Sequence, residues 1–197
     1  GARFAARWDG TTDRIYLAVV VPDTDNRFED DPSSSNTSDR IEVYSQGSGL
    51  GGGDYSANQD FAQQYVLGIT DSNHNALWAQ LGNGDPNVGV GSAELLQASK
   101  VDHNSGDLIY ELGIKQYDNY DAGGAGTLVT DLTAGDIVRL DVVVGTLLFD
   151  TFEGEDAFAQ LAENTDPTKF ANANNIAQYT LAEVGCGLWG YMTADIT

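Results

Sequence analysis

Short acidic side chains gather in the segment that begins at Asp23. The run Asp23-Thr24-Asp25-Asn26 is followed within a few residues by Glu29, Asp30 and Asp31. Carboxylate and amide oxygens are the ligands that Ca²⁺ prefers, and turns supply them most easily. Because the run follows an apolar strand pattern, a fixed backbone could bring these oxygens together. We therefore expect calcium here, with Asp23, Asp25, Asp30 and Asp31 as the metal ligands.

The three tryptophans suggest a second kind of site. Trp78 and Trp189 have small neighbours in the sequence, whereas Trp8 ends an apolar strand pattern. An exposed indole offers a flat apolar platform for the face of a sugar ring, and nearby polar groups can bind the hydroxyls. Trp8 is expected in the core. For Trp78 and Trp189 the core is an equal alternative, since tryptophan is usually highly buried.

Other motifs do not indicate catalysis. Gly47, Gly49 and Gly52 match a dinucleotide-binding pattern, but no helix is expected after them to bind a pyrophosphate at its N-terminus. His74 and His103 lie in polar turns without a nucleophile motif. Paired carboxylates, which glycoside hydrolysis needs, arise by chance among 30 acidic residues. We expect no catalytic residue, and therefore a protein that is not an enzyme.

Composition and charge exclude several classes of partner. The chain has 197 residues, 41% of them hydrophobic, which suits one domain over residues 1–197 with one core. Nine Lys and Arg against 30 Asp and Glu give a net charge of −21, so nucleic acid and anionic membranes are repelled. The single Cys186 excludes an intrachain disulfide. A solvated acidic coat is the simpler alternative to calcium as the reason for this charge.

Alternating apolar residues predict β-strands. In Arg14–Val21 the residues Ile15, Leu17 and Val19 fall on one face, a period of two that a helix would scatter. Nine strands are expected: Ala2–Trp8, Arg14–Val21, Asp39–Tyr44, Gln64–Thr70, Ala76–Leu81, Glu94–Val101, Asp107–Ile114, Asp136–Val144 and Gln178–Val184. Many short strands without long amphipathic helices indicate an all-β, antiparallel, jelly-roll-like sandwich.

The connections between these strands support antiparallel pairing. Trp8–Arg14 and Asp102–Asp107 carry the Asp, Asn and Gly that tolerate left-handed backbone, so each is expected to form a hairpin turn. Few helical turns are expected. The segment Glu155–Glu163 has apolar residues at helical spacing, and a weaker helical turn is expected at Lys115–Tyr120.

The succession of these segments resembles a known family. The runs FAARWD (Phe4–Asp9), RIYLAV (Arg14–Val19) and DRIEVY (Asp39–Tyr44), followed by YELGI (Tyr110–Ile114) and AGDIVRLD (Ala134–Asp141), are similar to the strands of family 9 carbohydrate-binding modules and their DOMON-like relatives. The resemblance implies a non-catalytic β-sandwich that is often stabilised by calcium. It also implies attachment to secreted polysaccharide-degrading enzymes or surface proteins, so an extracellular or cell-surface location is expected.

The resemblance also implies which residues bind the ligand. In sugar-binding members two tryptophans clamp a terminal sugar, one in mid-chain and one near the C-terminus, and Trp78 and Trp189 have a similar separation. The candidates near Trp78 for the family's charged and amide ligands are Gln80 and Asn83. The expected ligand-binding residues are therefore Trp78, Trp189, Tyr191, Gln80 and Asn83, and the expected partner is a polysaccharide or glycan.

Two alternatives follow from departures within the family. Members usually open with one more strand than Ala2–Trp8, and a missing edge strand could be donated by another subunit to build a filament or surface layer.

Some DOMON-like relatives bind haem through Met and Lys or His. Met192 is the only methionine, with Lys100, Lys115 and Lys169 as candidate partners. A lone core methionine is far more often packing, so no haem is expected.

Overall fold

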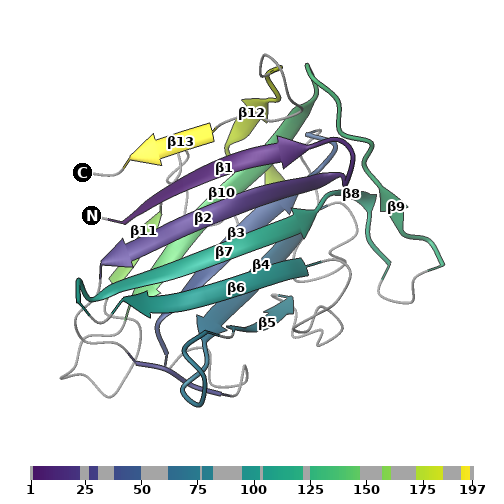
Figure 1. Cartoon of the computed structure of the whole chain (residues 1–197). Helices are drawn as coiled ribbons and strands as arrows, with labels where there is room; N and C mark the ends of the chain where they lie inside the picture. The colour runs from purple at the N-terminus through teal and green to yellow at the C-terminus, as the bar shows by residue number, and fades with distance from the viewer. Residues whose placement is uncertain are drawn as a thin grey trace.

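The structure of the protein is a computed structural model. This structure describes residues 2–22, 27–30, 38–49, 62–75, 77–81, 95–102, 104–121, 125–146, 157–160, 172–183 and 192–195. These residues form an antiparallel β-sandwich, as the alternation predicted, with one β-sheet stacked on another (Figure 1). Within them the helical structure is a 3-10 turn at Ala173–Asn175. No helix in these ranges is long and apolar enough to cross a membrane.

The two main sheets contain most of the strands. Sheet A has the order β13-β1-β2-β7-β6, with β13 Met192–Asp195, β1 Arg3–Asp9, β2 Arg14–Pro22, β7 Asp107–Lys115 and β6 Leu95–Asp102. Sheet B has the order β11-β10-β3-β4-β5, with β11 Ala157–Gln160, β10 Ile137–Thr146, β3 Arg40–Gln46, β4 Gln63–Ile69 and β5 Leu77–Leu81. A further strand, β12 Gln178–Thr180, also pairs with β10, and β8 Tyr117–Asn119 pairs with β9 Leu128–Val129.

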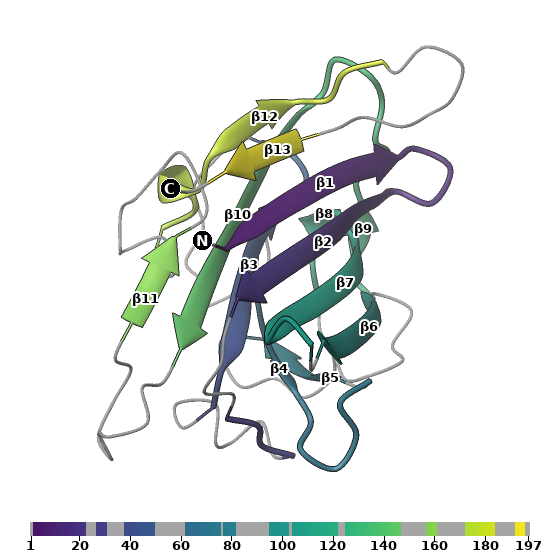
Figure 2. The ribbon, with the colours of Figure 1, turned by 60° about the vertical axis from the view of Figure 1, so that its left-hand side comes forward.

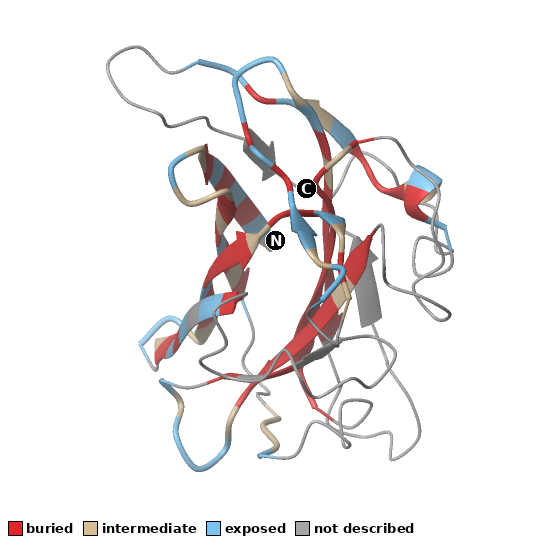
Figure 3. Ribbon diagram, turned by 90° about the vertical axis from the view of Figure 1, so that its right-hand side faces the viewer, coloured by how far each residue is buried: buried red, intermediate tan, exposed pale blue. Residues whose placement is uncertain are grey.

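Alternate residues of each strand fill the space between the sheets. In β2 the buried positions Ile15, Leu17 and Val19 belong to one apolar cluster with Ile41 and Val43 of β3. Trp8 is 5% exposed in the same cluster, so its predicted place in the core is confirmed. The two layers differ on their outer faces: β1 alternates between exposed and buried residues, whereas every residue of β3 is buried (Figure 3). This difference separates the two candidate surfaces described below.

Both predicted hairpins are confirmed. β1 and β2 pair from Arg3 opposite Val20 to Asp9 opposite Arg14, and the turn between them holds Asp13 at a φ of 53°. Aspartate tolerates this left-handed conformation better than most residues. In the second hairpin β6 ends at Asp102 and β7 begins at Asp107, and these two residues are paired.

A buried glutamine joins the end of sheet A to sheet B. Gln116 is fully buried, and its Oε1 accepts a hydrogen bond from Ser45 Oγ of β3 at 2.6 Å. Its Nε2 donates to the carbonyl of Ile114 at 3.1 Å, and its backbone N–H donates to the carbonyl of Asp13. The Gln116 carbonyl accepts from the N–H of Thr130. Because a buried amide group costs free energy unless it is hydrogen-bonded, these partners fix the corner between the sheets.

Both predicted helical segments are wrong. Within Glu155–Glu163 the described residues form the strand β11, which pairs with Val143–Thr146 of β10. The edge of β10 that faces away from β3 presents backbone groups that need partners, and pairing there outweighs a weak helical periodicity. The segment Lys115–Tyr120 contains the end of β7 and the strand β8 instead of a helical turn.

The edge of sheet A beside β1 is paired with a strand from far along the sequence. β13 pairs antiparallel with β1, from Arg3 opposite Asp195 to Ala6 opposite Met192 (Figure 2). The β1 edge is therefore already paired over these residues. A donated strand at this edge, the basis of the filament hypothesis, would have to displace β13.

Substitution of Leu67 tests the core between the sheets. Leu67 is fully buried in β4, so Leu67→Ala should lower the free energy of unfolding by about 2–5 kcal/mol through lost burial and the cavity left behind. Leu128→Ala is the matched control, because Leu128 is 61% exposed, and it should change stability by at most about 0.5 kcal/mol. Urea denaturation measures both. Equal effects of the two substitutions would contradict the described packing.

Candidate functional site

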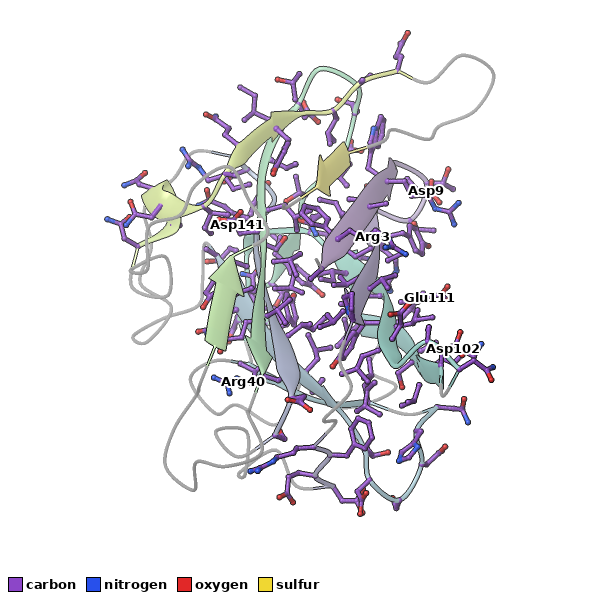
Figure 4. All side chains as sticks on the ribbon, turned by 90° about the vertical axis from the view of Figure 1, so that its left-hand side faces the viewer. Arg3, Asp9, Arg40, Asp102, Glu111 and Asp141 are labelled. Atoms are coloured by element: carbon purple, nitrogen blue, oxygen red, sulfur yellow. The ribbon has the colours of Figure 1, made fainter. Side chains whose placement is uncertain are left out.

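Polar side chains line the outer face of sheet B, the face turned away from sheet A. In β3, Ile41 and Val43 point into the core, so the alternate residues Arg40, Glu42 and Tyr44 lie on the outer face. Figure 4 shows Arg40 on this side, across the sandwich from Glu111 of sheet A. All three outer residues are buried despite their position. A buried polar group on a sheet face is expected to be held by hydrogen bonds.

The carboxylate of Glu42 is the centre of this network. Arg40 Nε donates to Oε1 at 3.2 Å, and the two side chains are only 4% and 9% exposed. The Tyr44 hydroxyl donates to Oε2. Gln64 Nε2 of β4 lies 2.8 Å from the same Oε2 and 3.1 Å from the Tyr44 hydroxyl. Three donors therefore fix one desolvated carboxylate in a single orientation.

Strand register brings two of the predicted sugar-binding positions into the same rows as this network. Trp78 of β5 is opposite Gly68, which is opposite Arg40. In the next row, Gln80 is opposite Val66, which is opposite Glu42. Trp78 and Gln80 are thus two strands from the network, roughly 10 Å between Cα atoms at the usual strand spacing. The backbone between Trp78 and Arg40 is a glycine, so no side chain separates their positions.

The row through Arg40 continues onto β10 with a second glycine. Gly145 is opposite Arg40, and a Cβ placed on Gly145 would lie 3.5 Å from Arg40 Cγ, Cζ and Nη1. The guanidinium therefore lies along the backbone of β10. Arg40 has a glycine as its cross-strand neighbour on both sides, so its side chain can lie flat on the sheet.

A second apolar cluster and an arginine hold other parts of the chain against this face. Tyr44, Ala62 and Val143 pack with Ala173 and Ile176 in a cluster separate from the main core. The cluster explains how outer-face residues come to be buried.

The arginine is Arg139 of β10. Its Nη1 donates to the carbonyls of Asn174 and Ile176 at 3.1 and 2.8 Å, and its Nε donates to the carbonyl of Gly49 at 3.2 Å. The two bonds from Nη1 tie the segment around Ala173–Asn175 to sheet B, and the bond from Nε ties Gly49 to it.

Of the four predicted metal ligands, the structure describes only Asp30. Asp30 is exposed, and its Oδ1 accepts hydrogen bonds from the backbone N and the Oγ of Ser72, both at 2.9 Å. Beside this pair, Phe28 contacts the ring of His74 with centroids 4.6 Å apart. Asp23, Asp25 and Asp31 lie outside the described residues. Within the described ranges, no three His, Cys, Asp or Glu side chains gather in a group that could hold a metal ion.

Comparison of the fold with solved structures finds similar proteins. A family 9 carbohydrate-binding module from Caldicellulosiruptor kristjanssonii in complex with glucose matches with a TM-score of 0.64 and 16% sequence identity, over 94% of this chain and 78% of that one. The structure with cellotriose matches with a TM-score of 0.64 and 15% identity, over 94% and 77%. The chain has the family 9 carbohydrate-binding module fold. No protein-family model and no curated protein sequence matches it.

Within this family 9 fold, the predicted ligand-binding residues are only partly placed. The backbone of Trp78 and Gln80 lies in β5, while Asn83, Trp189 and Tyr191 are outside the described residues. Sequence reasoning did not select Arg40, Glu42, Tyr44 or Gln64. A signal was present: Arg40, Glu42 and Tyr44 alternate with the core residues of one strand, which places three hydrogen-bonding side chains together on one face.

The contact between Asp30 and Ser72 predicts a lowered pKa for the Asp30 carboxyl group. The backbone N–H of Ser72, followed by its hydroxyl, stabilises the charged form and lowers the pKa of Asp30 below its ordinary value of 3.8. This contact should stabilise the fold fully above pH 3.8 and lose its effect as pH falls through the lower, folded-state pKa. NMR titration of the Asp30 carboxyl should show a midpoint below 3.8.

Ser72→Ala tests the cause of this shift. It removes the hydroxyl donor and keeps the backbone donor, so the Asp30 midpoint should move up towards its ordinary value. Asp102 is an internal control, because the backbone N–H of Asn104 is the main cause of its lowered pKa. An Asp30 midpoint that Ser72→Ala leaves unchanged would contradict the described contact.

Proposed function

We propose that this chain is a non-catalytic carbohydrate-binding module with its sugar site on the outer face of sheet B. The observation that carries the proposal is the buried Arg40–Glu42 pair, in register with Trp78 and Gln80. Two solved structures with this fold hold glucose and cellotriose, which supports a β-linked glucan or a related hexose chain as ligand.

The chemistry of the face suits a sugar. A carboxylate accepts hydrogen bonds from neighbouring hydroxyls, and an adjacent guanidinium donates to ring and hydroxyl oxygens. Indole rings at Trp78 and Trp189 would pack on the apolar faces of the sugar, with Tyr191, Gln80 and Asn83 as further polar contacts. Three donors already hold Glu42, an arrangement suited to fixed recognition more than to the proton transfer that bond cleavage needs.

A calcium ion and an external location complete the proposal. Asp23, Asp25, Asp30 and Asp31 offer the short carboxylates that suit Ca²⁺, and the ion would stabilise the segment after β2. The fold and the acidic composition are compatible with a secreted or cell-surface protein that acts on polysaccharide outside the cell.

Calorimetry with cellotriose tests the sugar site. Trp78→Ala and Trp189→Ala should each abolish measurable binding, because each removes one side of the clamp. Glu42→Gln should weaken binding by about 10- to 100-fold, the effect expected for losing a hydrogen bond to a charged group. Asp131→Asn, a neutralisation of an exposed carboxylate, is the control and should leave affinity unchanged.

The folding of each variant must be verified, since Glu42→Gln leaves the buried Arg40 without its carboxylate and should lower stability. The two tryptophan variants keep the Arg40–Glu42 pair, so once each is shown to be folded they test the clamp independently of Glu42. Unchanged cellotriose affinity in both would refute the clamp. Binding that survives Glu42→Gln in a folded protein would move the site away from sheet B.

Thermal unfolding tests the calcium ion. If Ca²⁺ binds the folded chain, added CaCl₂ should raise the Tm and EDTA should lower it, by the linkage between ligand binding and folding. Asp23→Asn and Asp25→Asn should remove this response, whereas Asp131→Asn should preserve it. A Tm that is the same in EDTA and in millimolar CaCl₂ would rule out a stabilising calcium site.

A further inference from the structure

The outer face of sheet A is exposed, unlike that of sheet B. Ala5, Ala18 and Glu111 are neighbours in one cross-strand row on β1, β2 and β7, and Arg7, Tyr16 and Gly113 are neighbours in the next row. Arg7, Ala18 and Glu111 are exposed. Figure 4 shows Glu111 turned away from the layer of side chains between the sheets. This face therefore offers side chains to a ligand without any rearrangement of the core.

Residues of these two rows and the backbone between them line an open groove of about 340 Å³. Its floor is formed by the methyl groups of Ala5 and Ala18 and by the backbone beneath them, and its walls include Arg7, Tyr16 and Glu111. The volume is at the lower end of the range for small-molecule sites, which suits one or two sugar rings. A floor of small apolar groups with polar walls is the arrangement that such sites commonly have.

Tyr16 forms a wall whose position is fixed from several sides. Its ring lies over β7 at Gly113, where a Cβ would be only 3.0 Å from Cε1 and 3.1 Å from Cδ1. The Arg7 guanidinium lies 5.3 Å from the ring centroid, within the distance of a cation–π contact. The Tyr16 hydroxyl is 3.4 Å from Thr12 Oγ1. The aromatic wall is thus preorganised, which lowers the entropic cost of binding.

We propose that this groove is a second saccharide site, which takes a pyranose unit of a neutral polysaccharide. The alanine floor and the Tyr16 ring fit the apolar C–H groups of the sugar, Glu111 accepts from its hydroxyls and Arg7 donates to its oxygens. A neutral sugar is favoured over an acidic one because Glu111 stands in the groove and the chain carries a net charge of −21.

The position of this groove determines what it adds to the function. It is on the opposite side of the sandwich from the Glu42 network, and the two sheets between them are about 10 Å apart. One short oligosaccharide cannot reach both faces. The two sites would therefore bind separate polysaccharide chains and join them, with the avidity that two linked sites provide.

NMR titration of the whole chain with cellotriose tests this second site. Amide shifts should appear in two groups, one on β3 to β5 and one on β1, β2 and β7. Glu111→Gln should weaken binding at the second group by about tenfold, the effect of losing a hydrogen bond to a charged group, and leave the first group unchanged. Lys100→Gln is the control, because Lys100 is exposed on the same sheet but does not line the groove.

The two proposals fail separately in this experiment. Glu42→Gln should remove the shifts on sheet B and preserve those on sheet A, so loss of the sugar site on sheet B leaves the second site measurable. Tyr16→Ala, once shown to be folded, should also remove the sheet A group. Shifts confined to sheet B would refute the second site. Preference of sheet A for trigalacturonate over cellotriose would refute its assignment to a neutral sugar.

Discussion

Burial of alternate side chains between two sheets determines both candidate surfaces of this protein. Because Ile41 and Val43 occupy the core, Arg40, Glu42 and Tyr44 must lie on the far side of β3. The same constraint on sheet A leaves Tyr16, Ala18 and Glu111 outside. A shift of one residue in the pairing of either strand would exchange these sets and remove both surfaces. The apolar pattern that gives stability therefore also sets the chemistry of each face.

The two outer faces differ because of what packs on them. On sheet B, Arg139 binds the carbonyls of Asn174 and Ile176, and Tyr44 packs with Ala173, so polar side chains there are held in a dry environment. In such surroundings the attraction within an ion pair is stronger than in water, but removing the two charges from water costs free energy. The pair is stable only if its remaining donors and acceptors are hydrogen-bonded. On sheet A the side chains are hydrated and their contacts are weaker. Each hydrogen bond to a ligand would contribute more binding free energy on sheet B. On sheet A, fewer side chains of the protein already occupy the face that a ligand would contact.

The sequence predicts the strands well and the site less well, for a physical reason. Alternation is a local signal, so a strand lies within each of the nine expected ranges, although the last is limited to Gln178–Thr180. β11 is mistaken for a helix because its pairing with β10 is not local. Trp78 was selected from its residue type, its small neighbours and its separation from Trp189, and none of these signals gives the strand register that sets it beside Arg40. Glu42 was missed because an outward position in a strand normally means solvent, and its burial depends on partners such as Gln64. Likewise, the contact of Asp30 with Ser72 joins residues that no spacing pattern relates.

The pairing of β1 with β13 has a consequence for the order in which the fold can form. The partners of Arg3 and Ala6 are Asp195 and Met192, almost the whole sequence away. Until β13 has been synthesised, this edge of β1 has no partner strand there, and its backbone donors and acceptors are open to wrong neighbours. Such high contact order slows folding. Sheet A is therefore closed at this edge only when two distant parts of the sequence have met.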